Sequence, residues 1–167
     1  MTQPSHPSFL IGPSDGRPIN SGSMVHKVGA GAFGDALLIV EGTLRPGELI
    51  PPHLHSREDE CTYVLSGHVT FEVGGEILEA ETGSYVLKPR NIPHAFWNSG
   101  PEPARLLVVH TPAGMDRYYD ELYAIFESTT LDTSQKRAAE AALHGKYGIT
   151  FYGHRIPELM ARYGVRP

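Results

Sequence analysis

The sequence has little cysteine and no long apolar run, and these absences exclude several classes of protein. Cys61 is the single cysteine among 167 residues, so the chain forms no internal disulfide. No run of about 18 apolar residues is present, which excludes a hydrophobic membrane-spanning helix. The N-terminus lacks the charged-then-apolar pattern of a secretion signal. We therefore expect a soluble, cytoplasmic protein.

An excess of basic residues is absent as well. The chain carries 14 basic and 19 acidic residues, for a net charge of -5, and the basic residues form no stripe. This balance excludes the electrostatic attraction that nucleic acids or anionic membranes require. Small molecules or other proteins are the expected partners. The length and the 40% apolar content suffice for one hydrophobic core, so we expect one globular unit.

Composition divides the chain into three ranges. Residues 1–22 are rich in Pro, Ser and Gly and show no periodicity, which predicts a flexible or extended N-terminal arm. Residues 23–112 contain short β-branched runs separated by turn residues, which predicts a β-barrel. Residues 113–167 show helical spacing, which predicts a helical extension packed on the barrel.

The middle range has the signals of antiparallel strands. Val69, Phe71 and Val73 alternate with polar residues, the period expected of a half-buried strand. Gly74-Gly75 follows directly and predicts a tight hairpin. The strand-like segments are ALLIVEGTL, CTYVLSG, HVTFEVG, EILEA, SYVLK and ARLLVVH. Together they predict a mainly β fold, an antiparallel barrel or sandwich.

The tail predicts helices that cover a flank of the barrel or its mouth. The first helical stripe comprises Tyr118, Leu122, Ile125 and Phe126. A second helix is predicted to begin after Asp132, a capping residue, and to end at Gly145. A short third helix is expected after Pro157.

Two histidines stand two residues apart in PPHLHSREDE, which predicts half of a metal site. On a strand, His53 and His55 project from one face about 6 to 7 Å apart. Glu60 opens the next strand after a turn at residues 56–59, and the hairpin returns it toward the histidines. His94, introduced by two prolines, begins another strand. Three imidazoles and one carboxylate suit Fe, Mn, Ni, Co, Cu or Zn, and do not suit Ca or Mg.

The spacing of these residues resembles the cupin superfamily. The chain contains the patterns G-x5-HxH-x4-E-x6-G, from Gly47 to Gly67, and G-x5-P-x4-H-x3-N, from Gly83 to Asn98. Asn91 stands where the family pattern has glycine, and asparagine tolerates the left-handed backbone that this turn demands. The resemblance implies a single-domain, jelly-roll β-barrel in which His53, His55, Glu60 and His94 hold one divalent transition metal ion.

The layout of the tail is similar to that of quercetin 2,3-dioxygenase-like single-domain cupins. That resemblance implies a metal-dependent dioxygenase that acts on a small enol or phenol, such as a flavonol, with dioxygen as co-substrate and Glu60 as the catalytic base. It also implies a homodimer. Two alternatives stay open: a non-redox lyase, isomerase, decarboxylase or cyclase that uses the metal as a Lewis acid, and a non-catalytic small-molecule binder. Dependence on oxygen would separate the first alternative from a dioxygenase.

The remaining polar and aromatic residues have simpler expected roles. Glu58 and Asp59 are expected in a solvated acidic turn. Among the histidines outside both patterns, His110 is the first candidate for a further role, because it ends a predicted core strand. Asn98 either orients a ligand or turns the chain. Four aromatic residues are expected in the core, with the walls of a substrate pocket as the alternative: Phe71, Tyr85, Phe96 and Trp97.

Overall fold

The computed structural model describes residues 10–19, 23–29 and 31–167. Much of the predicted arm, namely residues 1–9 and 20–22, lies outside the described residues. Within the arm, Arg17–Ile19 forms strand β1, which pairs with strand β2 (Met24–Val28). The division into an arm, a barrel and a helical extension stays a prediction.

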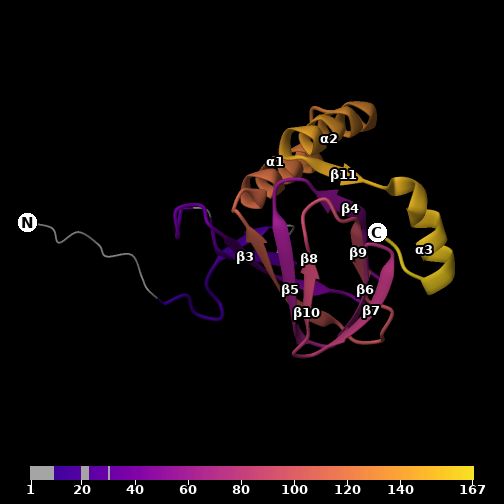
Figure 1. Cartoon of the computed structure of the whole chain (residues 1–167). Coiled ribbons are helices and arrows are strands. Elements are labelled where there is room, and N and C mark those ends of the chain that lie inside the picture. Colours follow the sequence, from indigo (N-terminus) through magenta and orange to yellow (C-terminus); the bar gives the residue numbers. More distant parts are fainter. Residues whose placement is uncertain (1–9, 20–22, 30) are drawn as a thin grey trace, which may run out of the picture.

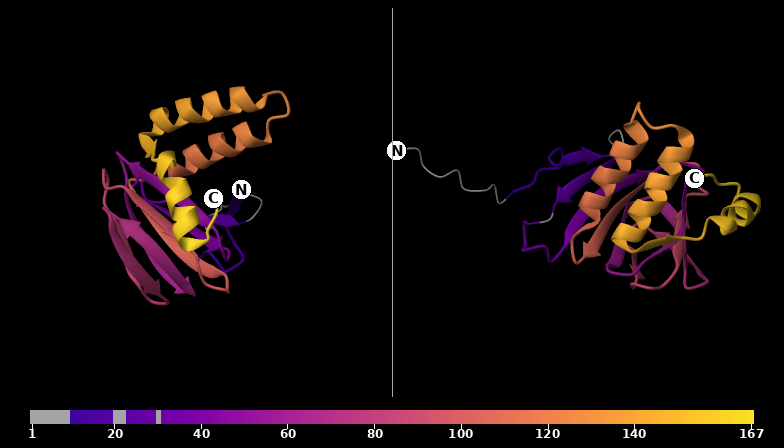
Figure 2. Two further views of the ribbon diagram at one scale, coloured as in Figure 1. Left: turned by 90° about the vertical axis from the view of Figure 1, so that its right-hand side faces the viewer. Right: turned by 90° about the horizontal axis from the view of Figure 1, so that it is seen from above.

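The described strands form two antiparallel sheets that face each other (Figures 1 and 2). The six-stranded sheet comprises, in spatial order, β1, β2, β3 (Leu38–Leu44), β10 (Ala104–Thr111), β5 (Asp59–Ser66) and β8 (Tyr85–Lys88). The five-stranded sheet comprises β11 (Ile149–Phe151), β4 (Leu49–His55), β9 (His94–Trp97), β6 (His68–Val73) and β7 (Glu76–Glu81). The predicted mainly β, jelly-roll fold with C-terminal helices is confirmed.

The core lies between the two sheets, and apolar side chains enter it from every second position of β6. Val69 and Phe71 on β6 point inward and are fully buried with Val64 of the opposite sheet. The predicted hairpin is also present, because Gly74 and Gly75 join β6 to β7 with φ of 60° and 90°. Such positive φ angles suit glycine, which has no Cβ.

Helices α1 (Met115–Glu127) and α2 (Thr133–Tyr147) form a hairpin over one end of the barrel (Figure 2). Their apolar faces pack on β1, β3 and β11 through the second core cluster: Ile19, Leu38, Val40, Met115, Tyr118, Leu143 and Ile149. Phe126, assigned to the stripe from sequence, is largely exposed. The predicted cap is confirmed, because Asp132 and Gln135 form a capping box. The predicted end at Gly145 is wrong, because the helix continues to Tyr147. The next residue, Gly148, adopts the left-handed conformation that ends the helix.

The third predicted helix, α3 (Ile156–Tyr163), has Pro157 in its first turn. A short 3-10 turn, Gly153–Arg155, precedes it. Helix α3 packs on the outer side of β4 and β9, where Leu159 meets Leu49 and Trp97. Of the helices in the described part of the chain, none combines the length and the apolar character needed to span a membrane.

Candidate metal centre

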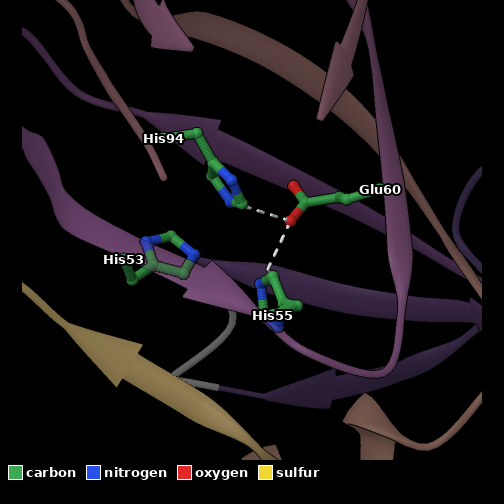
Figure 3. Close-up of side chains that lie close together, drawn as sticks. All are labelled: His53, His55, Glu60 and His94. Carbon is green, nitrogen blue, oxygen red and sulfur yellow. Dashed lines mark ion pairs between the residues drawn. The ribbon is translucent and has the colours of Figure 1, made fainter. Parts of the chain in front are cut away.

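Two adjacent strands of the five-stranded sheet bring the three predicted histidines together. His53 on β4 is the register partner of His94 on β9, and His55 lies two residues farther along β4. The ring centroids are 4.4 Å apart for His53 and His94, 5.0 Å for His53 and His55, and 5.5 Å for His55 and His94. All three side chains are buried and point into the barrel (Figure 3).

The fourth predicted residue reaches the same point from the opposite sheet. Glu60 on β5 places its Oε2 atom 3.3 Å from His55 Nε2 and 3.5 Å from His94 Nε2. One donor atom from each of the four residues lies within 4.8 Å of the others, and all four residues are buried. Figure 3 shows the side chains turned toward one another. The carboxylate thus returns to the histidines as expected, but the hairpin predicted from the sequence is wrong, because β4 and β5 lie in opposite sheets and do not pair.

Backbone carbonyls fix two of the imidazole rings. The Nδ1 atom of His53 lies 2.7 Å from the carbonyl oxygen of Pro51, and that of His94 lies 3.0 Å from the carbonyl oxygen of Ile92. A carbonyl only accepts, so both Nδ1 atoms carry the proton and donate. The Nε2 lone pairs of both rings are thus directed at the centre of the cluster, as in metal-binding histidines.

The cluster fits a divalent transition metal ion. Ligand atoms about 2.1 Å from one ion lie at most about 4.2 Å apart, so small side-chain movements would bring all four donors into contact with it. The Nε2 atom of His94 is buried and has no hydrogen-bond partner within the part of the chain that the structure describes, which is costly unless an ion or water binds there. Imidazole and carboxylate donors are of borderline softness and suit the metals from Mn to Zn.

The charges around the cluster keep it ready for a cation. Burial, with the neighbouring His94 and His55, holds the pKa of His53 well below its usual value, so the ring stays neutral. Burial alone would raise the pKa of Glu60. The positive charge of the Lys88 ammonium, with a hydrogen bond from His55, outweighs burial, so the Glu60 pKa lies well below its usual value. The carboxylate is ionised.

Glu58 and Asp59, the two acidic residues just before Glu60, lie in different environments. Asp59 is partly exposed and pairs with Arg90, whose hydrogen bonds lower the pKa of Asp59 to about 2. The expectation of a solvated role is wrong for Glu58, which is buried. Burial raises the pKa of its carboxyl group. Its Oε2 atom lies 3.9 Å from His55 Nδ1. The alternation of side chains explains the difference in burial, since Asp59 begins the strand and faces outward while its neighbours Glu58 and Glu60 face inward.

His110 lies beside the cluster, which supports its selection among the remaining histidines. It is the register partner of Glu60 across β10 and β5, and its Nδ1 atom lies 4.0 Å from Glu60 Oε2. Burial lowers the pKa of His110 to about 4, so the ring is neutral at pH 7. Neither ring nitrogen has a hydrogen-bond partner among the described residues.

A mostly apolar cavity of about 230 Å³ opens onto the cluster. Of the four aromatic residues considered from sequence, only Phe96 lines it. The expected core role is confirmed for Phe71, in the main core, and for Trp97, which packs on the other face of β9 against Tyr163 of α3, so the alternative role as pocket walls is wrong for both. Both expected roles are wrong for Tyr85, which is 71% exposed. Tyr118, Tyr119 and Tyr123 of α1 and Phe151 of β11 supply aromatic walls that the sequence had not indicated.

Lys88 is a buried residue of the site that sequence reasoning missed. Alternation along β8 contained the signal, because Lys88 shares the inward face with Val86, while Tyr85 and Leu87 face outward. A prediction from hydrophobicity alone would have placed Tyr85 and Leu87 on the inward face and Lys88 on the outward face. The tyrosines of α1 could not be found in this way, since nothing in a helical stripe states which cavity it will face.

Two asparagines of the family patterns have structural roles. Asn91 has a φ of 64°, which confirms the left-handed turn expected where the pattern has glycine. Asn98 donates to the carbonyl oxygens of Leu44 and Glu102 and accepts from the backbone of Gly100. Asn98 therefore turns the chain, the second of its two expected roles.

Comparison with known proteins finds similarity over part of the chain. Two curated relatives match part of the chain: polyketide synthase CurC of Streptomyces cyaneus is 32% identical over 69 residues, and protein SchB of Streptomyces halstedii is 34% identical over 64 residues. The matches cover 41% and 38% of this chain, and 45% and 46% of those proteins. The chain thus aligns with less than half the length of either relative.

Solved structures share the fold. KdgF from Halomonas sp. superposes with a TM-score of 0.51 at 21% identity, covering 56% of this chain and 81% of KdgF. A predicted oxalate decarboxylase from Thermotoga maritima superposes with a TM-score of 0.52 at 24% identity, covering 53% and 78%. Residues 40–110 match the family described as the cupin domain. Residues 40–110 are therefore similar to the cupin domain, and the two solved structures show that the fold is shared.

Proposed function

We propose that the chain is a metal-dependent oxygenase that acts on a small enol or phenol. The observation that carries the proposal is the position of the four donor atoms, which converge at the end of an aromatic-lined, mostly apolar cavity. Four protein donors leave one or two positions open on an ion that accepts five or six, and open positions are typical of catalytic sites. Apolar walls that exclude water suit a flat, aromatic substrate.

The residues of the chain have separate roles in this proposal. His53, His55, Glu60 and His94 would hold one divalent ion, which supplies Lewis-acid and, if redox-active, oxygen chemistry. Glu60, which its lowered pKa keeps ionised, would accept the proton of the substrate hydroxyl at Oε2, the oxygen that faces the cluster, because Oε1 accepts from Lys88. The aromatic walls orient the ring of the substrate. Dioxygen is the proposed co-substrate.

A second candidate is a non-redox reaction on a polyketide-like aromatic substrate, such as a cyclisation. The observation that favours it is the similarity of 69 residues of the chain to a protein named polyketide synthase. The same four residues and the same cavity would serve, with the ion acting only as a Lewis acid. Oxygen dependence separates the two candidates.

The test combines metal content with oxygen uptake. The purified protein is analysed for bound metals, and turnover of a panel of flavonols and other enols is followed in an oxygen electrode and, in parallel, under argon. Uptake of one dioxygen per substrate supports the oxygenase. Conversion under argon at the same rate supports the second candidate, and binding without conversion in either atmosphere would leave only a binding protein.

Variants then test the residues. We expect His53→Ala and His94→Ala to lose both metal and turnover, because each removes one of three imidazole donors. His68→Ala is the matched control, since His68 is a half-exposed histidine on β6. Glu60→Gln should keep part of the metal and lose about 100-fold in rate, the typical value of a general base. Full turnover of metal-free His94→Ala would contradict the site assignment.

A further inference from the structure

Lys88 is a lysine buried inside the barrel. It ends β8, is 1% exposed, and stands next to Glu60 in the register of β5 and β8. Its Nζ atom lies 4.7 Å from the ring centroid of Phe96 and 5.6 Å from that of Phe71. An ammonium in such surroundings needs a counter-charge, and the Glu60 carboxylate provides it.

The two oxygens of Glu60 have different partners. Oε1 accepts a hydrogen bond from the ammonium of Lys88. Oε2 is the atom that faces the histidines, 3.3 Å from His55 Nε2 and 3.5 Å from His94 Nε2. The contact with Lys88 therefore points one oxygen away from the cluster and leaves the other for an ion.

We propose that Lys88 is a positioning residue that limits Glu60 to one ligand oxygen and keeps a positive charge beside the bound ion. The inference rests on the metal site of the proposed function. Denticity matters because a carboxylate that binds through both oxygens occupies an additional position on the ion. With Lys88 in place, that position stays open for substrate.

The charge has a second consequence. Partners around a metal site are commonly carboxylates, which make a ligand more basic and strengthen metal binding. A lysine acts in the opposite direction, because it withdraws charge from Glu60 and repels the cation. The four ligands, a divalent ion and the Lys88 ammonium would together carry a net charge of plus two, and plus one when the buried Glu58 beside His55 is ionised and counted. Such a centre at the end of an apolar cavity favours an anionic substrate, such as an enolate, over a neutral one.

The experiment uses Co²⁺, whose visible absorption weakens as its coordination number rises. Wild type, Lys88→Met and Lys146→Met are stripped of metal and titrated with Co²⁺ in competition with a chelator. Lys146→Met is the matched control, because it also breaks a lysine–glutamate pair, the exposed one with Glu121. We expect Lys88→Met to bind Co²⁺ about 10-fold more tightly than the control and to show weaker visible bands, as Glu60 binds through both oxygens.

Equal affinity in Lys88→Met and the control, or weaker binding in Lys88→Met, would overturn the inference. If metal-free Lys88→Met is unfolded, circular dichroism during the Co²⁺ titration replaces the competition: refolding by Co²⁺ supports the inference and failure to refold refutes it. A wild type that binds no Co²⁺ more tightly than His94→Ala would refute the metal site itself. Failure of the Lys88 inference alone leaves the proposed function intact.

Discussion

Single side chains in the cluster are oriented by the backbone as much as by one another. The Nδ1 protons of His53 and His94 are held by carbonyls of residues two positions earlier on the chain. The chain segment that supplies each of these two histidines thus also supplies the hydrogen bond that sets its tautomer. No distant residue is needed for this part of the site, which is why the spacing in the sequence already located these ligands.

His26, which is not one of the four predicted ligands, allows a test of how the stability of the fold depends on pH. It is buried on β2, and its Nδ1 atom accepts from the guanidinium of Arg17 at 2.6 Å. Burial and then the charge of Arg17 lower the pKa of His26, while Asp116 and Asp120 act in the raising direction. In the unfolded chain the ring would take up a proton near pH 6.5. The folded state resists protonation, so stability is lost as the pH falls below that value.

We therefore expect His26→Gln to reduce the loss of Tm between about pH 7.5 and about pH 5.5 relative to wild type. Thermal unfolding followed by circular dichroism gives this difference. His68→Gln, at a half-exposed histidine, should keep the slope of the wild type. An unchanged slope in His26→Gln would show that other groups govern stability in this range.

Among the elements, helix α2 depends on its first turn. The carboxylate of Asp132 accepts from the backbone of Gln135 at 2.9 Å, and the side chain of Gln135 accepts in return from the backbone of Asp132 at 2.9 Å. We expect Asp132→Ala to lower the free energy of unfolding by about 1 kcal/mol. Urea unfolding measures it, with Ser134→Ala in the same exposed turn as the control. Equal stability of the two variants would show that the hairpin frays without effect on the fold.

Elements were predictable where their signal is local. The alternation in β6, the glycine pair of its hairpin and the cap at Asp132 all follow from neighbours in sequence. The end of α2 was misplaced because Gly145 is tolerated inside a helix at a cost of about 1 kcal/mol, and Gly148, three residues later, ends it. The order of strands in the sheets, and the return of β11 to pair with β4, depend on contacts far apart in sequence and had no local signal.

At the scale of the whole molecule, the outer face of the six-stranded sheet carries exposed apolar side chains. Tyr85 and Leu87, on the edge strand β8, are 71% and 68% exposed. A second copy of the chain could cover both by a two-fold contact in which each copy presents the same surface. This is where we place the interface of the homodimer predicted from the sequence.

We expect Leu87→Glu to convert a dimer to a monomer, because a charge would be buried in the contact. Light scattering coupled to gel filtration gives the mass. Ile77→Glu is the control, since Ile77 is 40% exposed on β7, an edge strand of the other sheet. A monomeric wild type, or a dimer that survives Leu87→Glu, would contradict this interface. The cytoplasmic location stays a prediction from the single cysteine, the missing secretion-signal pattern and the missing long apolar run.

Two parts of the chain form the cavity, and they contribute different groups to it. Strands β4, β5 and β9, inside residues 40–110, present the donor atoms, whereas α1 and β11 lie outside that range and form much of the aromatic wall. Mutations in residues 113–151 would therefore change which molecules are accepted while the donors keep their places. In an evolving lineage of such proteins, substrate choice would diversify long before the shared inorganic chemistry is lost.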